Sequence, residues 1–457
     1  MTSVSIPIVR RALLAAGLLL ATAEPLAART LTHRVWLLGG VPDAPVLQAL
    51  RAAGVGGTVI PVGTLELERR TCRLKLVPLA DVAVLSELAP SALVWLDAQD
   101  PVTADPAAFA AQLAPVQRLF PAGASVVLAA RRYVPGLAAF AGAAARELKQ
   151  TVELALPAPE LQRHLADESW TATPLIAIAL GNPAALSLPS VPPQDDLAAL
   201  AELDARGLRY RVAMAVTASV QPVPGAGGAS LAQLASDAAA AYRPGERGDV
   251  FELRRALDWG GVALAPGQLI TVEAVDAARY HRDLALVLRP VRGLLEGWDT
   301  VGLPANEPTL GMSRAAFLDY LRGGSFAPTP RIEAAAVSGT AVRVTLSNPG
   351  AQASAFAPSA NWVEIHFSGT EIRDVQLGDF AGVSYGRRRS SGFEPVVVRD
   401  ATDVRLILRY LPPHARVSGG VVRFLSRPRA LSARWNVRLG DGSEIRGEET
   451  ALALTSP

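Results

Sequence analysis

From residue 34 to about residue 324, short apolar runs alternate with longer segments that have the apolar spacing of a helix. Apolar runs bounded by Gly, Pro or Asp are typical of buried strands, whereas apolar positions at i, i+3 and i+4 predict helices. The predicted strands cover residues 35–38, 57–62, 92–97, 125–129, 152–156, 175–180, 210–216, 269–275 and 298–303. The predicted helices cover residues 45–53, 106–120, 137–150, 159–168, 195–205, 231–242, 277–286 and 313–322.

This alternation predicts a parallel sheet, because a helix between two strands returns the chain to the edge where it began. Roughly eight strands match a (β/α)8 TIM-barrel-like domain, which we place at residues 30–326. A doubly wound open α/β sheet shows the same alternation and is the alternative fold. Residues 65–76 alternate charged and apolar positions and predict an inserted hairpin.

The pattern changes after Pro328 and Pro330. Short runs rich in Val, Ile and Arg then alternate apolar and polar positions, and turn residues separate them. No helix-length pattern intervenes, so residues 331–455 predict an all-β sandwich domain.

The first 23 residues have the features of a secretory signal peptide. Arg10 and Arg11 precede a short apolar core, and Ala21 and Ala23 form a small-x-small cleavage pattern. We therefore expect an exported protein that is periplasmic or extracellular. No later stretch is apolar for ~18 residues, so no stable membrane span is expected after signal cleavage.

The overall charge of the chain gives no support for a nucleic-acid partner. Lys plus Arg number 44 against 42 Asp plus Glu, which is a formal net charge of +2. This balance does not predict nucleic-acid binding.

The single cysteine, Cys72, cannot form an internal disulfide, and its neighbours Arg70 and Arg73 are expected to lower its pKa.

The candidate chemistry lies at the ends of predicted strands. Asp97 and Asp100 follow an apolar strand, and Glu273 ends another. Carboxylates at the carboxyl ends of barrel strands lie where such barrels place their active sites. Hydrolysis of a glycosidic bond needs one carboxyl as acid and a second as base or nucleophile. We therefore predict Asp97 and Glu273 as the catalytic pair, with Asp100 tuning the pKa of Asp97.

Four further residues follow predicted strands and are candidates for substrate binding: Arg131, Tyr133, Asn306 and Glu307. The alternative interpretation is that these residues and the acids are helix caps and loop charges. Tryptophans are the usual platforms for sugar rings, and the barrel candidates are Trp36, Trp95, Trp170, Trp259 and Trp298.

Other reaction classes have little support. Residues 382–386 match Gly-x-Ser-x-Gly, but they lie in a region that predicts only strands, where a nucleophile elbow has no following helix. There is no P-loop, and the five histidines have no zinc-binding spacing. The sequence therefore predicts neither a cofactor nor a metal.

Three short motifs carry a resemblance: Val35-Trp36-Leu37-Leu38, the strand from Leu93 to Ala98, and the segment from Trp298 to Pro304. Together they resemble a family of uncharacterised secreted bacterial proteins with a glycoside-hydrolase-like barrel and a C-terminal β-sandwich. In that family the strand carries a denser Asp-x-Asp pattern, whereas here the second acid is displaced to Asp100.

The resemblance implies a glycoside-hydrolase-like barrel with a β-sandwich behind it and supplies no established activity. With the strand-end carboxylates it favours an exported protein that interacts with a polysaccharide or other glycan, and any turnover is expected to be hydrolysis of a glycosidic bond. The alternative is a non-catalytic binding or scaffold protein of the cell envelope, with a degenerate barrel and an envelope protein partner on the β-sandwich.

Overall fold

The computed structural model describes most of the chain between residues 31 and 452. Not described within that range are residues 69–70, 79–81, 99–100, 131, 166–174, 180–193, 217–218, 223–239, 243–249, 254–255, 260–261, 274, 289–292, 305–311, 358–359, 391 and 448–449. The predicted signal peptide lies outside the described residues. In the described part of the chain, no helix has the length and apolar character that crossing a membrane requires.

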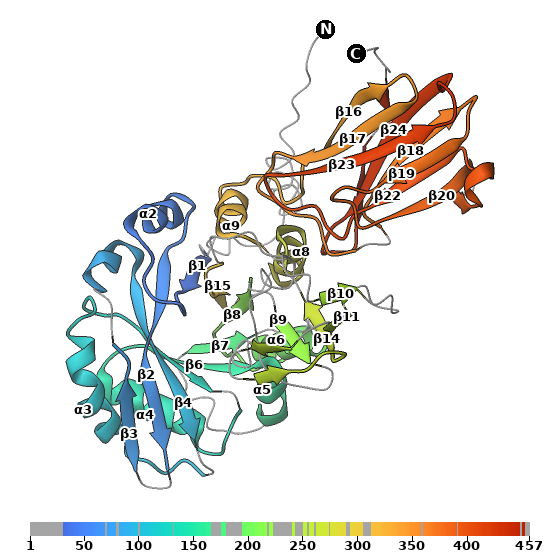
Figure 1. Ribbon diagram of the computed structural model, residues 1–457. Coiled ribbons are helices and arrows are strands. Elements are labelled where there is room, and N and C mark those ends of the chain that lie inside the picture. The colour runs from blue at the N-terminus through green and yellow to red at the C-terminus, as the bar shows by residue number, and fades with distance from the viewer. Residues whose placement is uncertain are drawn as a thin grey trace, which may run out of the picture.

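The first domain is built on a parallel sheet (Figure 1). Its strands are β1 (Thr32–Trp36), β2 (Gly57–Leu67), β4 (Pro90–Ala98), β5 (Val126–Ala130), β6 (Val152–Pro157), β7 (Leu175–Ala179), β8 (Tyr210–Ala215) and β15 (Leu295–Val301). They pair in the order β1-β15-β8-β7-β6-β5-β4-β2, and β1 also pairs with β2 through three residue pairs. Each of the eight strands therefore has two parallel neighbours.

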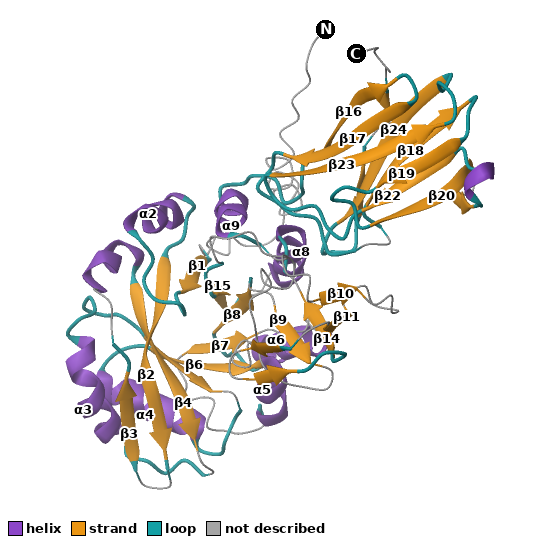
Figure 2. Ribbon diagram, in the orientation of Figure 1, coloured by secondary structure: helices purple, strands orange, loops and turns teal. Residues whose placement is uncertain are grey.

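Helices follow these strands on the outside of the sheet (Figure 2). They are α2 (Ala44–Ala52), the 3-10 helix η1 (Val82–Leu88), α3 (Pro106–Gln117), α4 (Leu137–Leu148), α5 (Ala158–His164), α6 (Gln194–Ala205), α8 (Ala277–Leu288) and α9 (Arg314–Leu321). Local signals place their starts: the Asp105 carboxylate accepts from the Ala107 N–H ahead of α3, and Pro106 occupies its first turn. β5 is buried along its whole length, as expected of a strand covered on both faces.

Strand order decides between the two predicted folds. Neighbours in the sheet follow chain order without reversal, whereas a doubly wound sheet reverses at a switch point. The doubly wound alternative is therefore wrong, and the domain is TIM-barrel-like. It departs from a regular (β/α)8 barrel because β2 continues past the end of β1 and pairs with the antiparallel β3 (Cys72–Leu76). That pairing confirms the predicted hairpin.

The strand predicted over residues 269–275 is not part of the parallel sheet. It forms β14 (Leu269–Glu273), which pairs antiparallel with β9 (Ser219–Pro222) and β11 (Val250–Leu253). With β10 (Ala240–Tyr242) these strands form a separate four-stranded sheet, and in the sequence all four follow β8 and precede α8. In the same part of the sequence β12 (Leu257–Trp259) and β13 (Val262–Leu264) form a two-stranded antiparallel sheet. The apolar pattern of residues 269–275 correctly predicted a strand, but it did not predict which strands pair with it.

The second domain holds two antiparallel sheets. One contains β16 (Arg331–Ser338), β17 (Ala341–Asn348), β23 (Ala415–Phe424) and β19 (Ile372–Gln376). The other contains β21 (Gly392–Pro395), β20 (Gly382–Arg389), β22 (Asp403–Ile407), β18 (Trp362–Ser368), β24 (Ala430–Arg438), β25 (Glu444–Arg446) and β26 (Thr450–Ala451). Side chains from both sheets share one core. The Gly-x-Ser-x-Gly match lies within antiparallel β20, which rules out a nucleophile elbow.

The domains contact each other through α8, α9 and loops of the β-rich domain (Figure 1). The Asp276 carboxylate, ahead of α8, accepts from the Arg279 N–H at 2.8 Å and the Gly440 N–H at 2.6 Å. Burial raises the pKa of Asp276 against these donors. The Gln352 amide donates to the Ala316 carbonyl in α9. A buried side chain of each domain therefore hydrogen-bonds to the backbone of the other domain.

Candidate functional site

Alternate residues of the parallel strands point into the space that the sheet surrounds. The middle of this space is filled by small and aliphatic side chains around one tryptophan: Trp36, Val59, Leu93, Val127, Ala129, Ala155, Ala213 and Val301. Trp95 packs on this cluster and meets Trp36 edge to face, with ring centroids 6.4 Å apart. Trp36 is buried, whereas Trp95 is half-buried. Of these two rings, Trp95 therefore lies nearer to solvent.

Asp97 lies two residues beyond Trp95 at the carboxyl end of β4, and its side chain is exposed. Because strand residues two apart share a face, Asp97 extends the inward row formed by Ser91, Leu93 and Trp95. Asp97 therefore lies at the carboxyl end of a parallel strand, as predicted from the sequence.

A second carboxylate lies beside Asp97 and was missed from the sequence. Glu66 of β2 is the direct register partner of Asp97, so the two residues share a face on strands about 4.8 Å apart. The Glu66 carboxylate also accepts from the Lys75 ammonium of β3. The signal in the sequence was the alternating hairpin of residues 65–76, but the pairing of β2 with β4 is a tertiary contact.

Glu273 does not follow a strand of the parallel sheet. Its backbone pairs with Ser219, four residues beyond Ala215, the last residue of β8. β8 lies four strands from β4 in either direction round the sheet. The backbone partner of Glu273 thus belongs to the chain segment that follows β8, a strand on the opposite side of the sheet from β4.

The other predicted site residues divide into two groups. Tyr133 is only 5% exposed and belongs to the outer hydrophobic core, which leaves little of its side chain for a substrate. Its N–H donates at 3.0 Å to the carboxylate of Glu160, a half-buried residue in the first turn of α5. Asp100, Arg131, Asn306 and Glu307 lie outside the described residues.

The amino ends of the strands hold a buried ionic network. The Arg34 guanidinium donates to both oxygens of Glu153, at 2.6 and 2.7 Å, and to both oxygens of Asp299, at 3.0 and 2.6 Å. The Arg211 Nε donates to Asp299 at 2.9 Å, as does the Trp36 indole. Two arginines face two carboxylates, so the network is neutral. Its ion pairs join β1, β6, β8 and β15 across the interior.

These contacts set the charge states in the interior. Burial alone would raise the pKa of Asp299, but the charges and hydrogen bonds of Arg34 and Arg211 outweigh it and lower that pKa. His33, on the outer side of β1, hydrogen-bonds to Thr300 Oγ1 at 2.9 Å. Burial, helped by the charge of Arg211, lowers the pKa of His33 to about 4 and so keeps the ring neutral.

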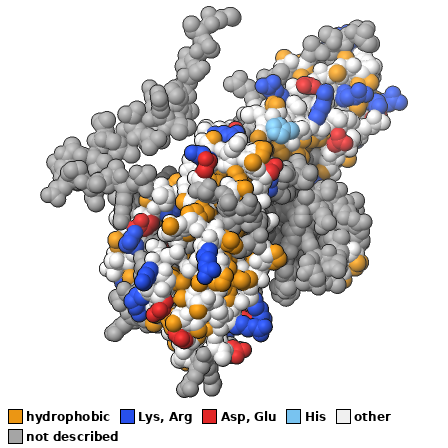
Figure 3. Space-filling model, turned by 90° about the vertical axis from the view of Figure 1, so that its left-hand side faces the viewer, with side chains coloured by type: hydrophobic (Ala, Val, Ile, Leu, Met, Phe, Trp, Pro, Cys, Tyr) orange, Lys and Arg blue, Asp and Glu red, His pale blue; other side chains and the backbone are white. Residues whose placement is uncertain are grey.

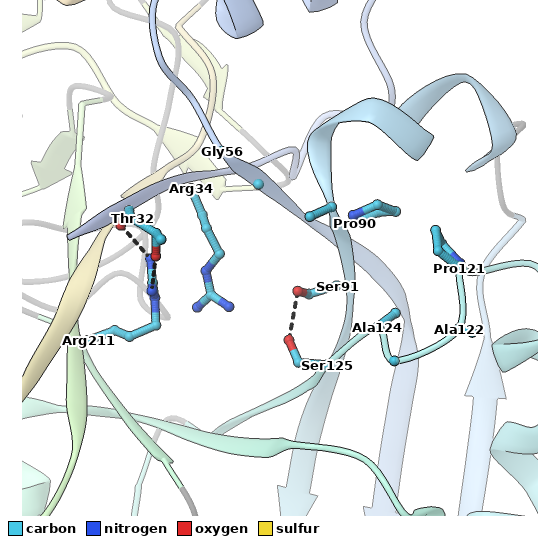
Figure 4. Close-up of a pocket in the computed structure, with 13 residues that line it drawn as sticks. Thr32, Arg34, Gly56, Pro90, Ser91, Pro121, Ala122, Ala124, Ser125 and Arg211 are labelled. Atoms are coloured by element: carbon cyan, nitrogen blue, oxygen red, sulfur yellow. Dashed lines mark hydrogen bonds between the residues drawn. The ribbon is translucent and has the colours of Figure 1, made fainter. Parts of the chain in front are cut away.

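A cavity of about 430 Å³ opens at the amino ends of the strands beside this network (Figure 4). Its polar lining includes Arg34, Arg211, Thr32 and the hydroxyl pair of Ser91 and Ser125, whose oxygens lie 2.8 Å apart. The arginines already donate to protein acceptors. In barrels of this type the amino end of the sheet serves stability and the carboxyl end serves chemistry. We therefore take the Asp97 end as the candidate functional site.

The described side chains offer no group of three or more His, Cys, Asp or Glu residues that would hold a metal ion. Cys72 does not have the lowered pKa expected from its arginine neighbours. Burial, followed by the charge of Asp105, raises the pKa of its thiol from 9.0 to about 11.

No protein-family model matches the chain, and no curated protein matches it. Similar solved structures include the spore cortex-lytic enzyme SleL of Bacillus megaterium, with TM-score 0.36 and 12% identity over 61% of this chain and 72% of that chain. The GH18 chitinase ChiB of Flavobacterium johnsoniae has TM-score 0.35 and 10% identity over 60% of this chain and 88% of that chain. A xylanase and α-amylase inhibitor protein solved with trehalose has TM-score 0.33 and 9% identity over 64% and 96%. These neighbours include glycoside-hydrolase-type folds, but similarities this distant assign no function to this chain.

Proposed function

We propose that the chain is an exported protein that binds a polysaccharide at the carboxyl ends of its parallel strands. The observation that carries the proposal is the exposed Asp97 carboxylate beyond the half-buried Trp95 ring, with Glu66 directly across the strand pair. An indole supplies an apolar face for a sugar ring, and carboxylates accept hydrogen bonds from its hydroxyls. Export rests on the N-terminal signal pattern alone.

We further propose that the bound glycan is hydrolysed, with Asp97 as the proton donor to the leaving oxygen. Two carboxylates supply the second group in different geometries. Glu66, on the neighbouring strand, suits the ~5 Å separation of a retaining glycosidase, in which the second carboxylate is the nucleophile. Glu273 is the second group expected from the sequence, and its use would correspond to the wider separation of an inverting glycosidase, with a water between the two carboxyl groups.

A binding protein without turnover is the second candidate function. It is favoured by the ion pair between Glu66 and Lys75, which occupies the carboxylate nearest to Asp97. Tyr133, a predicted substrate-binding residue, also favours a protein without turnover. Its side chain is buried in the core, and the nearby Glu160 carboxylate is used as an acceptor for the Tyr133 N–H. In this case the domain would hold a glycan or scaffold the cell envelope, with the β-rich domain contacting a protein partner.

The test uses the purified full chain without its first 23 residues on a panel of polysaccharides, measuring both affinity and the release of reducing ends. Trp95→Ala is expected to weaken glycan binding at least ~10-fold. Asp97→Asn is expected to abolish turnover while leaving affinity within about threefold. Glu147→Gln, which removes an exposed carboxylate of α4, is the matched control and should change neither.

The anomeric configuration of the first product then separates Glu66 from Glu273 as the second group. Binding without turnover in the unaltered protein would establish the binding candidate. Affinity that Trp95→Ala leaves unchanged on every glycan bound would remove the carboxyl end of the sheet as the site.

A further inference from the structure

The outward face of the seven-stranded sheet in the β-rich domain carries charges in a row. Ser384, Arg405, Glu364 and Arg434 are direct register partners across β20, β22, β18 and β24, so they share one face. The alternate residues of β18, such as Val363, point into the core between the two sheets. The row therefore lies on the side of the sheet that no second sheet covers.

Glu364 is fully buried although it lies on this outward face, because arginine side chains cover it. Its carboxylate accepts from Arg405 Nε at 2.7 Å, from Arg434 Nε at 2.8 Å and from an Arg388 Nη at 3.2 Å. Asp403, also fully buried, accepts from the His366 ring at 3.0 Å and from the Arg388 N–H at 2.9 Å. Three guanidinium groups thus surround two carboxylates.

Arg405 is held in one orientation. Its guanidinium carbon lies 4.1 Å from the centroid of the Trp362 ring and 3.9 Å from that of the Phe393 ring. The Phe393 ring lies over Gly386, where a Cβ would come within 2.4 Å of it. With Nε on Glu364, the two Nη groups of Arg405 make no hydrogen bond to the described residues. They form a fixed, unused pair of donors on a side chain that is 21% exposed.

Positive charge exceeds negative charge here and in the whole domain. Residues 331–457 contain 16 arginines, no lysine and 12 acidic residues. Basic side chains are visible on the β-rich domain in Figure 3. Burial lowers the pKa of Arg405 and outweighs the hydrogen bond and charge of Glu364, which raise it, and the charge of Arg434 acts in the same direction as burial. An added carboxylate at this place would therefore meet uncompensated positive charge.

We propose that this face binds a carboxylated polysaccharide, with the Nη groups of Arg405 donating to a uronate carboxylate and Arg434 adding a second contact. A planar guanidinium with two free donors matches the two oxygens of a carboxylate. The rings on both sides of Arg405 fix the donors before binding, which lowers the ordering cost. The choice of a polysaccharide over other carboxylated polymers rests on the proposed function; the carboxylate specificity does not.

The test measures the affinity of the full chain for polygalacturonate and for fully methyl-esterified polygalacturonate, which has the same backbone without charge. The esterified polymer is expected to bind at least ~10-fold more weakly. Arg405→Gln should weaken polygalacturonate binding ~10-fold or more, and Arg405→Lys should do so too, because an ammonium keeps the charge but not the fork. The control is Arg416→Gln, an exposed arginine paired with Glu333 on the other sheet, which should stay within twofold.

Phe393→Leu keeps every charge and frees Arg405, so it should also weaken binding, and it decides the test if the Arg405 variants fail to fold. Equal affinity for the two polymers, or unchanged affinity in folded Arg405→Gln or in Phe393→Leu, would overturn the proposal. Polyglutamate that binds as tightly as polygalacturonate would overturn its polysaccharide part. Trp95 lies in the other domain, so Trp95→Ala should leave the affinity of this face for polygalacturonate unchanged. The proposed glycan site at Trp95 and the proposed carboxylate site at Arg405 can therefore each fail without the other.

Discussion

Arg34 and Asp299 lie 265 positions apart in the chain, and Nη2 of Arg34 donates to Oδ2 of Asp299 at 2.6 Å inside the parallel sheet. The contact joins β1 to β15, the first and last strands of that sheet. Since Arg211 and Glu153 complete the network, removal of one partner leaves buried charge without compensation.

Asp299→Asn is therefore expected to lower the free energy of unfolding by about 3–5 kcal/mol, the usual result of breaking a buried ion pair from one side. Glu202→Gln is the control, because its pair with Arg206 is exposed and contributes less than about 0.5 kcal/mol. Urea unfolding at pH 7 measures both. A loss below about 1 kcal/mol for Asp299→Asn would contradict the role given to this network.

His33 should make stability depend on pH. Its pKa is about 4 in the folded protein against 6.5 when exposed, so the unfolded chain takes up a proton first as the pH falls. The neutral ring's contribution is complete above pH 6.5 and is lost toward pH 4, by about 3 kcal/mol in total.

His33→Gln should accordingly flatten the pH dependence of the unfolding free energy between pH 6.5 and 4, measured as the difference from the unaltered protein. His414→Asn, which changes an exposed histidine of the β-rich domain, is the control. A slope equal in the unaltered protein and in His33→Gln would show that His33 titrates normally in the fold.

Gly440 of the β-rich domain contacts Asp276 of the first domain, with its N–H 2.6 Å from the Asp276 carboxylate. An added Cβ would lie 2.4 Å from Oδ1 of Asp276, whose carboxylate is buried and cannot move away freely. Gly440→Ala should lower stability by about 1–3 kcal/mol through overpacking. Gly339→Ala, where a Cβ meets open space, is the control in the same thermal unfolding experiment. Equal midpoints for the two variants would mean that the domains do not pack through Asp276.

Cys72 should react slowly in the folded protein. Since its thiol has a pKa of about 11, the thiolate at pH 7.5 is about 100-fold scarcer than for an ordinary thiol. Iodoacetamide labelling followed by mass spectrometry should show a rate that rises with pH up to that pKa, and urea should restore the ordinary rate. Labelling of the folded protein as fast as in urea would support the arginine effect expected from the sequence.

Local pattern was sufficient for the strands of the parallel sheet but not for their partners. It was wrong at residues 240–242, which end a predicted helix and form strand β10. Buried runs such as Val126–Ala130 and the cap formed by Asp105 are properties of adjacent residues, so they could be predicted from the sequence. Residues 269–275 have the same apolar pattern, yet they pair antiparallel in another sheet. Strand pairing depends on residues far away in the chain, and periodicity does not contain that information.

The sequence by itself determined the parallel α/β domain, the β-rich domain after it and the exposed acid at the end of β4, because each follows from local apolar spacing and from the residue that ends a run. Only the tertiary structure decided that Glu66 lies beside Asp97 and that Arg34 meets Asp299. It also placed Arg405 between Trp362 and Phe393. The physical reason is register: the pairing of strands fixes which side chains share a face, and no local pattern specifies it.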